Sequence, residues 1–235
     1  MYRAHGRHLI SIAFVFYVLL FGIALVLALV MGAFGQLVGA LIAVAGVFWV
    51  QGALVTAIED VRDGRADLTA RQTIAHIRPV LNRLSLAAIG ILIGVIIAVF
   101  VIAIGFILFV IPGIVALVAF VIFAVRWSLL VPVLMLERKT VFGSLDRSQE
   151  LVRGHTMAAF LVLLASLGFV LLVAILVAIV LAPFDPPRWL DEPIRSVVSG
   201  TLVAPFSALA LTLMYYRLRA VKEPAPEPQP GPLAA

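Results

Sequence analysis

The sequence predicts an all-α polytopic membrane protein, with six transmembrane helices in three hairpins and two cytoplasmic amphipathic surface helices. Two observations support this class. Hydrophobic residues make up 64% of the 235 residues and charged residues 12%, with a mean hydropathy of +1.20, whereas soluble domains are about 45–50% apolar. The apolar residues also form long runs, and about 20 of them in a helix cross a bilayer. We expect one integral domain over residues 1–222 and a disordered, proline-rich cytoplasmic tail over residues 223–235.

The first hairpin is predicted by two apolar runs, Leu9–Met31 and Leu37–Ile58, which an uncharged turn at Gly32–Gln36 connects. The basic start Met1–His8 is similar to that of a secretory signal peptide. The apolar part of a signal peptide, however, is only about 7–15 residues long. We therefore expect the first run to remain as an uncleaved span.

The largest polar insert, residues 61–83, contains five arginines and predicts the first surface helix. Asp67 or Thr69 can cap this helix, because both residue types accept a hydrogen bond from the backbone at a helix start. Pro79 should kink the helix or begin the next span, since proline has no backbone N–H. The apolar residues expected on one face are Ile74, Ile77, Leu81 and Leu84.

The second hairpin is predicted by the runs Leu84–Ile111 and Ile114–Leu136, with a tight reversal at Pro112 and Gly113 between them. We expect the fourth run to form one continuous span. Arg126 then lies well inside that span, where a charge is costly and usually faces a partner or a wet cavity.

A second surface helix is predicted after the charged residues Glu137–Lys139. Thr140 or Ser144 can cap its start. The apolar residues expected on one face are Phe142, Leu145 and Val152. Basic residues in both surface helices favour a position against anionic lipid headgroups.

The third hairpin is predicted by Met157–Ala182 and Ile194–Tyr216, with the proline-rich loop Pro183–Pro193 between them. Fourteen of the 17 lysines and arginines then fall on one side of the six spans. Basic loops face the cytoplasm, so we expect a multi-pass protein of the inner (plasma) membrane with both termini cytoplasmic. The sequence pI of about 10.2 reflects these loops and does not indicate nucleic-acid binding.

Three sequence stretches lie in order at the predicted span boundaries. They are RWSLLVPVLMLE at Arg126–Glu137, SLDRSQELVRGH at Ser144–His155 and LMYYRLRAVKE at Leu213–Glu223. Together they resemble the glycerophosphoryl diester phosphodiesterase membrane-domain family, with Arg217 where that family usually has an acidic residue. The resemblance implies a multi-span helical membrane unit. In the family, a separate soluble domain carries out hydrolysis, so the resemblance of the membrane unit implies no catalytic residue.

The predicted ligand-binding site combines two polar side chains with two tryptophans. These residues are Arg126, Gln51, Trp127 and Trp49. Gln51 in the second span and Arg126 in the fourth lie at similar depth, each beside one of the tryptophans, and would bind the anionic headgroup of a phospholipid. In the alternative interpretation, Arg126 extends its charge to the membrane surface, or pairs with Glu137 or Glu59 and locks the helices together.

A non-enzymatic function is expected, because no phosphate-binding loop, nucleophile elbow or zinc-protease motif occurs and the chain has no cysteine. We expect neither a cofactor nor a metal site. The leading hypothesis is a protein that handles or senses membrane phospholipids, or that supports a membrane partner protein. The alternative is a transporter for a small amphiphilic or anionic molecule, with a cavity lined by polar residues. These residues are Gln51, Arg126, Thr201, Ser207 and Thr212.

Overall fold

The computed structural model describes residues 2–62, 70–184 and 187–223. Within these ranges the chain forms α-helices and two short 3-10 turns, Arg78–Val80 and Ala182–Phe184, but no strand, which confirms the predicted all-α class. The helices are α1 (Tyr2–Arg62), α2 (Ala70–Ile77), α3 (Leu81–Leu108), α4 (Val110–Arg126), α5 (Leu130–Leu136), α6 (Val141–Val152), α7 (Thr156–Leu181) and α8 (Arg188–Lys222). The two residues expected to cap α2, Asp67 and Thr69, and the predicted tail from residue 224 onward lie outside the described residues.

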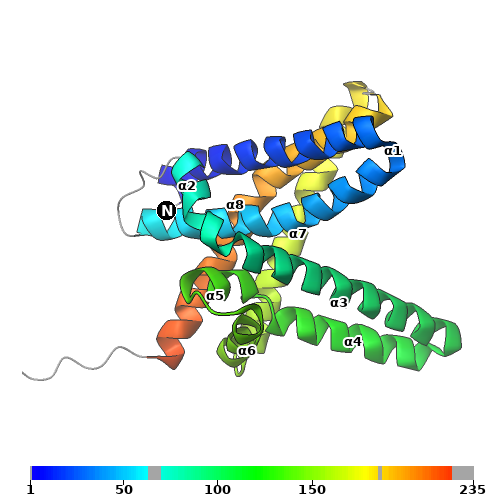
Figure 1. The fold of residues 1–235 in the computed structure, drawn as a ribbon. Coiled ribbons are helices and arrows are strands. Elements are labelled where there is room, and N and C mark those ends of the chain that lie inside the picture. Colours follow the sequence, from blue (N-terminus) through cyan, green and yellow to red (C-terminus); the bar gives the residue numbers. More distant parts are fainter. Residues whose placement is uncertain (1, 63–69, 185–186, 224–235) are drawn as a thin grey trace, which may run out of the picture.

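Two antiparallel halves make up α1, which turns back on itself at Gly32 (Figure 1). Gly32 has φ 60° and ψ −134°, a conformation that other residues rarely adopt, so the reversal falls within the predicted turn. The two halves approach closely beside this turn. A Cβ atom added to Gly35 would lie 1.9 Å from the carbonyl oxygen of Leu27, so only glycine fits there.

The reversal between α3 and α4 lies at Phe109, before the predicted positions Pro112 and Gly113. Phe109 is extended, with φ −159° and ψ 149°. Pro112 lies in the first turn of α4, where backbone N–H groups have no partner within the helix and the missing N–H of proline is tolerated. Gly105 and Gly113 allow the two helices to approach. A Cβ atom on Gly105 would lie 2.9 Å from the Cα of Gly113, and a Cβ atom on Gly113 would lie 2.5 Å from the Cγ of Phe106.

The fourth apolar run is not one continuous helix. α4 ends at Arg126, residues 127–129 form a turn, and α5 then begins at Leu130. The prediction of a single unbroken helix up to Leu136 is therefore wrong. The stretch Val110–Leu136 as a whole is still long and apolar enough to cross a membrane, and Arg126 lies at the break within it.

Pro132 and Ser148 explain this break. In a continuous helix the ring of Pro132 would clash with the carbonyl group of Ser128 and would leave it without its hydrogen bond. The turn is stabilised from α6 instead. The Oγ of Ser148 accepts a hydrogen bond from the backbone N–H of Leu129 at 3.2 Å and donates one to the carbonyl oxygen of Arg126 at 2.7 Å.

α6 begins after Thr140, whose Oγ1 accepts a hydrogen bond from the N–H of Gly143 at 3.2 Å. Thr140, and not Ser144, is therefore the cap. The predicted apolar face is wrong at Phe142, whose side chain is 80% exposed. Two small serines take part in the buried face at helical spacing and leave Phe142 on the opposite side. The buried residues are Ser144, Ser148, Leu151 and Val152.

α7 agrees with the predicted fifth span to within one residue at each end. The loop predicted at Pro183–Pro193 is shorter than expected, because α8 begins at Arg188 and carries Pro193 inside the helix.

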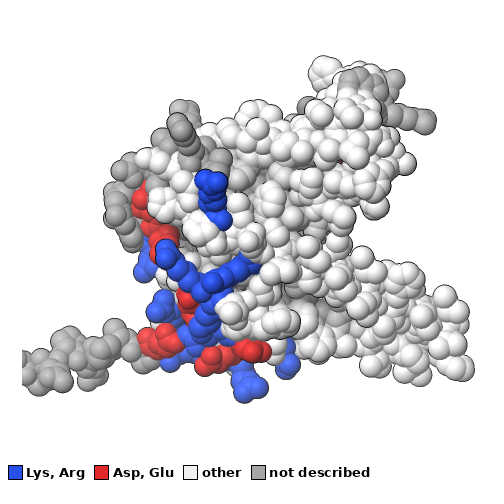
Figure 2. All heavy atoms as spheres, in the orientation of Figure 1, with Lys and Arg blue, Asp and Glu red and all other residues white. Residues whose placement is uncertain are grey.

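Two limbs diverge in the view of Figure 1. One contains α1, which packs against α8 through buried residues such as Ile12, Leu54 and Ala204; the other is the hairpin of α3 and α4. α2, α5 and α6 lie at one end of the molecule, with the start of α1 and the end of α8. On the face shown in Figure 2, the charged side chains gather at this same end. The ion pair of Arg195 with Asp191 lies near the start of α8, at the other end of that helix.

Five helical stretches of the described chain are long and apolar enough to cross a membrane, when the doubled-back α1 is counted once. They are Leu9–Arg62, Ala75–Leu108, Val110–Leu136, Thr156–Phe184 and Leu190–Lys222. Large apolar side chains on these helices are exposed, as on Ile107 at the tip of α3 (82%). Helices with their own backbone hydrogen bonds satisfied and an apolar surface are the structure that a lipid bilayer requires. The chain therefore has the architecture of a membrane protein.

Candidate functional site

A cavity of about 590 Å³ lies where the two limbs meet, between α1, α3 and α4. α5 closes one end through Leu130 and Val131, and α8 contributes Leu211. All but three of the 19 residues that line the cavity are apolar or glycine, and none of these 19 carries a charged side chain. Cavities of this size and composition are typical of sites for small molecules.

The three polar residues in the lining are Gln51, Trp127 and Ser128. Trp127 and Ser128 belong to the turn after α4, so they lie at the end of the cavity next to α5. From there the lining continues along α3 and α4 toward the tips of the hairpin, through residues such as Val101 and Ala116. The cavity therefore has one polar end and one apolar end.

Two polar atoms at this end have no hydrogen-bond partner within the described chain. They are the Nε1 of Trp127 and the Oγ of Ser128, and both atoms are buried. A buried donor or acceptor left unpaired costs about 1–3 kcal/mol. The indole ring of Trp127 also packs against Phe123, with 5.2 Å between the ring centroids. The polar end is thus held in place by packing and has unused hydrogen-bonding capacity.

The structure brings two of the four predicted site residues together. Gln51 and Trp127 both line the cavity. Arg126 ends α4, is exposed and does not belong to the lining. Trp49 is outside the lining as well: its Nε1 donates a hydrogen bond to the Oγ of Ser85 at 3.0 Å, which connects α1 to α3.

The polar residues of α8 that a transporter cavity was expected to use are not in this lining. α8 contributes only Leu211, and Thr201, Ser207 and Thr212 lie elsewhere in the helix. Sequence reasoning also missed Ser128, although its position directly after Trp127 was a usable signal. The cavity is consequently more apolar than the sequence predicts.

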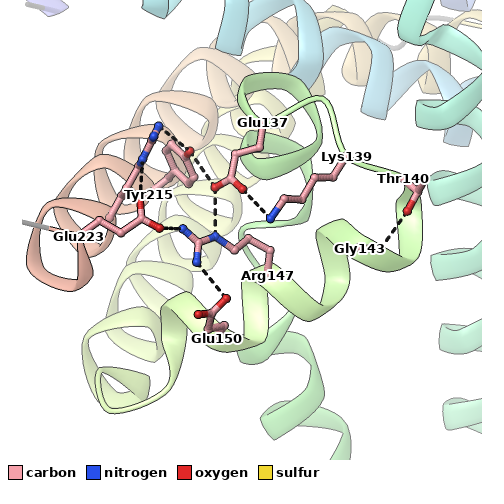
Figure 3. Close-up of polar contacts among 9 residues, drawn as sticks. Glu137, Lys139, Thr140, Gly143, Arg147, Glu150, Tyr215 and Glu223 are labelled. Atoms are coloured by element: carbon pink, nitrogen blue, oxygen red, sulfur yellow. Dashed lines mark hydrogen bonds and ion pairs between the residues drawn. The ribbon is translucent and has the colours of Figure 1, made fainter.

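A charged cluster connects the end of α5, α6 and α8, and Figure 3 shows Glu137, Arg147 and Tyr215 converging from these segments. We define the charged cluster as Glu137, Lys139, Arg147, Glu150, Tyr215, Arg219, Lys222 and Glu223. Arg147 is at its centre. Its Nε lies 3.2 Å from the Oε1 of Glu137, its Nη1 lies 2.9 Å from the Oε2 of Glu150, and its Nη2 pairs with Glu223. The hydroxyl of Tyr215 donates to the same oxygen of Glu137 at 3.0 Å.

Glu137 and Arg147 are the most enclosed pair of the charged cluster, with side chains 13% and 12% exposed. Burial alone would raise the pKa of Glu137, but hydrogen bonds from Lys139, Arg147 and Tyr215 outweigh it and hold the pKa below its usual value. Burial would likewise lower the pKa of Arg147, and its glutamate partners hold it above its usual value. Both groups are therefore charged at neutral pH. Arg126, the partner considered for Glu137 from the sequence, is not among the partners found in the described chain.

The charged cluster connects the three quoted sequence stretches. Glu137 ends the first stretch, Arg147 lies in the second, and Tyr215 and Glu223 belong to the third. Glu137 and Tyr215 are 78 residues apart, so no local periodicity predicts that they meet. Arg217, at the position where the resembled family usually has an acidic residue, is exposed and is not a member of the charged cluster.

Comparisons with protein-family models, with curated proteins and with solved structures find no match to this chain. The function is therefore inferred from the cavity, the charge distribution and the helices themselves.

Proposed function

We propose that this chain is a non-enzymatic integral membrane protein that binds a membrane lipid or a similar amphiphile in the cavity between α1, α3 and α4. In this proposal α1 crosses the plasma membrane twice, and α3, α4, α7 and α8 cross it once each. α2 and α6 lie along the cytoplasmic surface, and both termini are cytoplasmic.

The charge distribution supports this orientation. Charged side chains gather at the end that holds α2, α5 and α6 (Figure 2), and basic segments near span ends remain cytoplasmic. The exposed Phe142 on α6 supports a surface position for that helix, because an apolar ring beside charged residues suits the boundary between headgroups and acyl chains.

The observation that carries the proposal is the cavity itself. Its apolar walls match a hydrocarbon chain, and its polar lining residues, Gln51, Trp127 and Ser128, match a group that forms hydrogen bonds. An amphiphile has these two parts in this order. Binding of such a molecule needs neither a nucleophile nor a metal.

Membership in the glycerophosphoryl diester phosphodiesterase membrane-domain family is part of the proposal. Contacts within the charged cluster join all three resembling stretches, which supports membership. Proteins that share one structural unit are expected to share the residues that hold this unit together. Transport of the same amphiphile is the second candidate function. The divergence of the two limbs favours it, since the cavity lies between two separate hairpins and its ligand could leave between them.

The experiment is native mass spectrometry of the protein released from nanodiscs that were formed without detergent. Gly94 lines the cavity, and a Cβ atom there would have open space around it, so Gly94→Trp fills the cavity without distorting α3. Gly90→Trp is the matched control, because Gly90 also faces open space but is not in the lining. We expect the wild-type protein and the control to retain a lipid that Gly94→Trp loses. Equal retention in all three proteins would contradict the proposal, and so would the absence of lipid from the wild type.

A further inference from the structure

We infer that the ligand of this cavity is a single-chain amphiphile with a small, uncharged head group that forms hydrogen bonds, such as a monoacylglycerol. The inference rests on the proposed function and names the chemical class of its ligand. It differs from the anionic phospholipid headgroup that the sequence predicts for Arg126 and Gln51.

The cavity volume sets the number of chains. At roughly 30 Å³ for each non-hydrogen atom, the volume that one water molecule occupies in the liquid, a cavity of about 590 Å³ holds on the order of 20 such atoms. One acyl chain with a glycerol head has about this many atoms, and a diacyl lipid has nearly twice as many. The lining on α3 extends from Ile91 to Val101, a length of about 15 Å at 1.5 Å per residue. The cavity is therefore long enough for one chain of about a dozen carbons, and its volume matches the atoms of one chain and its head.

The lining residues set the charge of the head group. No lysine, arginine or histidine is among the 19 lining residues, and the nearest basic residue in sequence, Arg126, is exposed outside the lining. A phosphate group enclosed here would lose its water without gaining a cation, which is strongly unfavourable in an apolar environment. An uncharged hydroxyl or ester group loses far less and needs only hydrogen bonds.

The three polar lining residues supply those hydrogen bonds once the buried polar atoms of Trp127 and Ser128 turn toward the ligand. The amide of Gln51 both donates and accepts, the indole of Trp127 only donates, and the hydroxyl of Ser128 does either. The Oγ of Ser128 changes direction by one χ1 rotation between staggered positions, so it can turn toward a ligand. A glycerol head with two hydroxyls and an ester carbonyl matches this mixture of donors and acceptors. The acyl chain then extends along α3 and α4.

The test compares three added probes in nanodiscs of fixed phospholipid composition. Detergent is avoided, because many detergents are themselves single-chain amphiphiles. The probes are monolauroylglycerol, lysophosphatidic acid with the same lauroyl chain, and dilauroylglycerol. Binding of each probe is titrated by native mass spectrometry for the wild type, Gln51→Leu, Gly94→Trp and the control Gly90→Trp.

We expect monolauroylglycerol to bind at least tenfold more tightly than either of the other probes. Gly94→Trp should abolish this binding and Gly90→Trp should leave it unchanged. Gln51→Leu should weaken it roughly fivefold, the effect of losing about one hydrogen bond. Equal or tighter binding of lysophosphatidic acid would overturn the uncharged head group, and equal or tighter binding of dilauroylglycerol would overturn the single chain. If Gly94→Trp abolishes the binding of that other probe, the proposed function still holds. If no probe depends on Gly94, the proposed function fails as well.

Discussion

Replacing Arg147 by methionine should destabilise the protein, because Arg147 is the centre of the charged cluster. The substitution keeps an unbranched apolar side chain in place of the aliphatic part of arginine and removes all three ion pairs. The pair with Glu137 matters most, since both side chains are about one-eighth exposed, and a hydrogen bond between charged groups contributes about 1.5–3 kcal/mol. The pairs with Glu150 and Glu223 reach solvent, with glutamate side chains 63% and 45% exposed, and add little.

The free energy of unfolding should therefore fall by about 2 kcal/mol in Arg147→Met, the lower part of that range, because Lys139 and Tyr215 still hold the charge of Glu137. Unfolding is followed by circular dichroism during titration with sodium dodecyl sulfate in mixed micelles. Arg195→Met is the matched control. Its pair with Asp191 is about one-third exposed on both sides, so it should change the free energy of unfolding by less than about 1 kcal/mol.

A double-mutant cycle between Glu137→Gln and Arg147→Met isolates the pair. We expect a coupling energy of about 1–2 kcal/mol, within the range for residues in one ion-pair network. A change below about 0.5 kcal/mol in Arg147→Met, or a cycle without coupling, would refute the assignment of Arg147 as the centre of the charged cluster.

Three further predictions follow from the fold. The pKa of Glu137 lies below its ordinary value of 4.5 in the folded protein. Its stabilising contribution is therefore complete above pH 4.5 and is lost as the pH falls toward the pKa of the folded state. Acid unfolding should be steeper in the wild type than in Glu137→Gln. Ser148→Ala removes both hydrogen bonds to the turn after α4 and should lower the free energy of unfolding by about 1–3 kcal/mol. The control Ser166→Ala loses only a hydrogen bond within α7 and should have a smaller effect in the same titration with sodium dodecyl sulfate. Gly35→Ala forces the halves of α1 apart and should lower the thermal midpoint sharply, whereas Gly22→Ala, with open space around its Cβ, should leave it unchanged or raise it.

The class of fold and the limits of α7 could be predicted from the sequence because both depend on local properties. Ser166 is the one polar residue in the run Met157–Ala182, and polar or proline residues mark both ends. The turn at Gly32 could also be predicted from the sequence, since glycine readily adopts the backbone conformation found there.

The break after Arg126 was harder to predict because apolar residues continue on both sides of it. Pro132 is the local signal, yet proline is also found inside helices of this chain, as Pro205 in α8 shows. The hydrogen bonds that decide the outcome come from Ser148, in a different helix. The break also explains why Arg126, predicted inside a continuous helix, instead ends α4 and is exposed.

Part of the candidate site could be predicted from the depth of its residues within the predicted membrane spans. Gln51 and Arg126 are predicted at similar distances from the cytoplasmic ends of their spans, each beside a tryptophan. Gln51 and the neighbour of Arg126, Trp127, line the cavity, and Arg126 does not. Side-chain direction could not be derived in the same way, because it depends on how the limbs pack. For that reason Trp49, two residues before Gln51, points to Ser85 and not into the cavity.

The most direct test of lipid binding in the cavity is photo-crosslinking with a monoacylglycerol that carries a diazirine near the end of its chain, followed by peptide mapping in nanodiscs. We expect labels on lining residues of α3 and α4, such as Val101 and Phe120, and loss of these labels in Gly94→Trp. Labels spread evenly over exposed positions such as Ile107 and Val30, which are 82% and 77% exposed, and unchanged in Gly94→Trp would contradict the account.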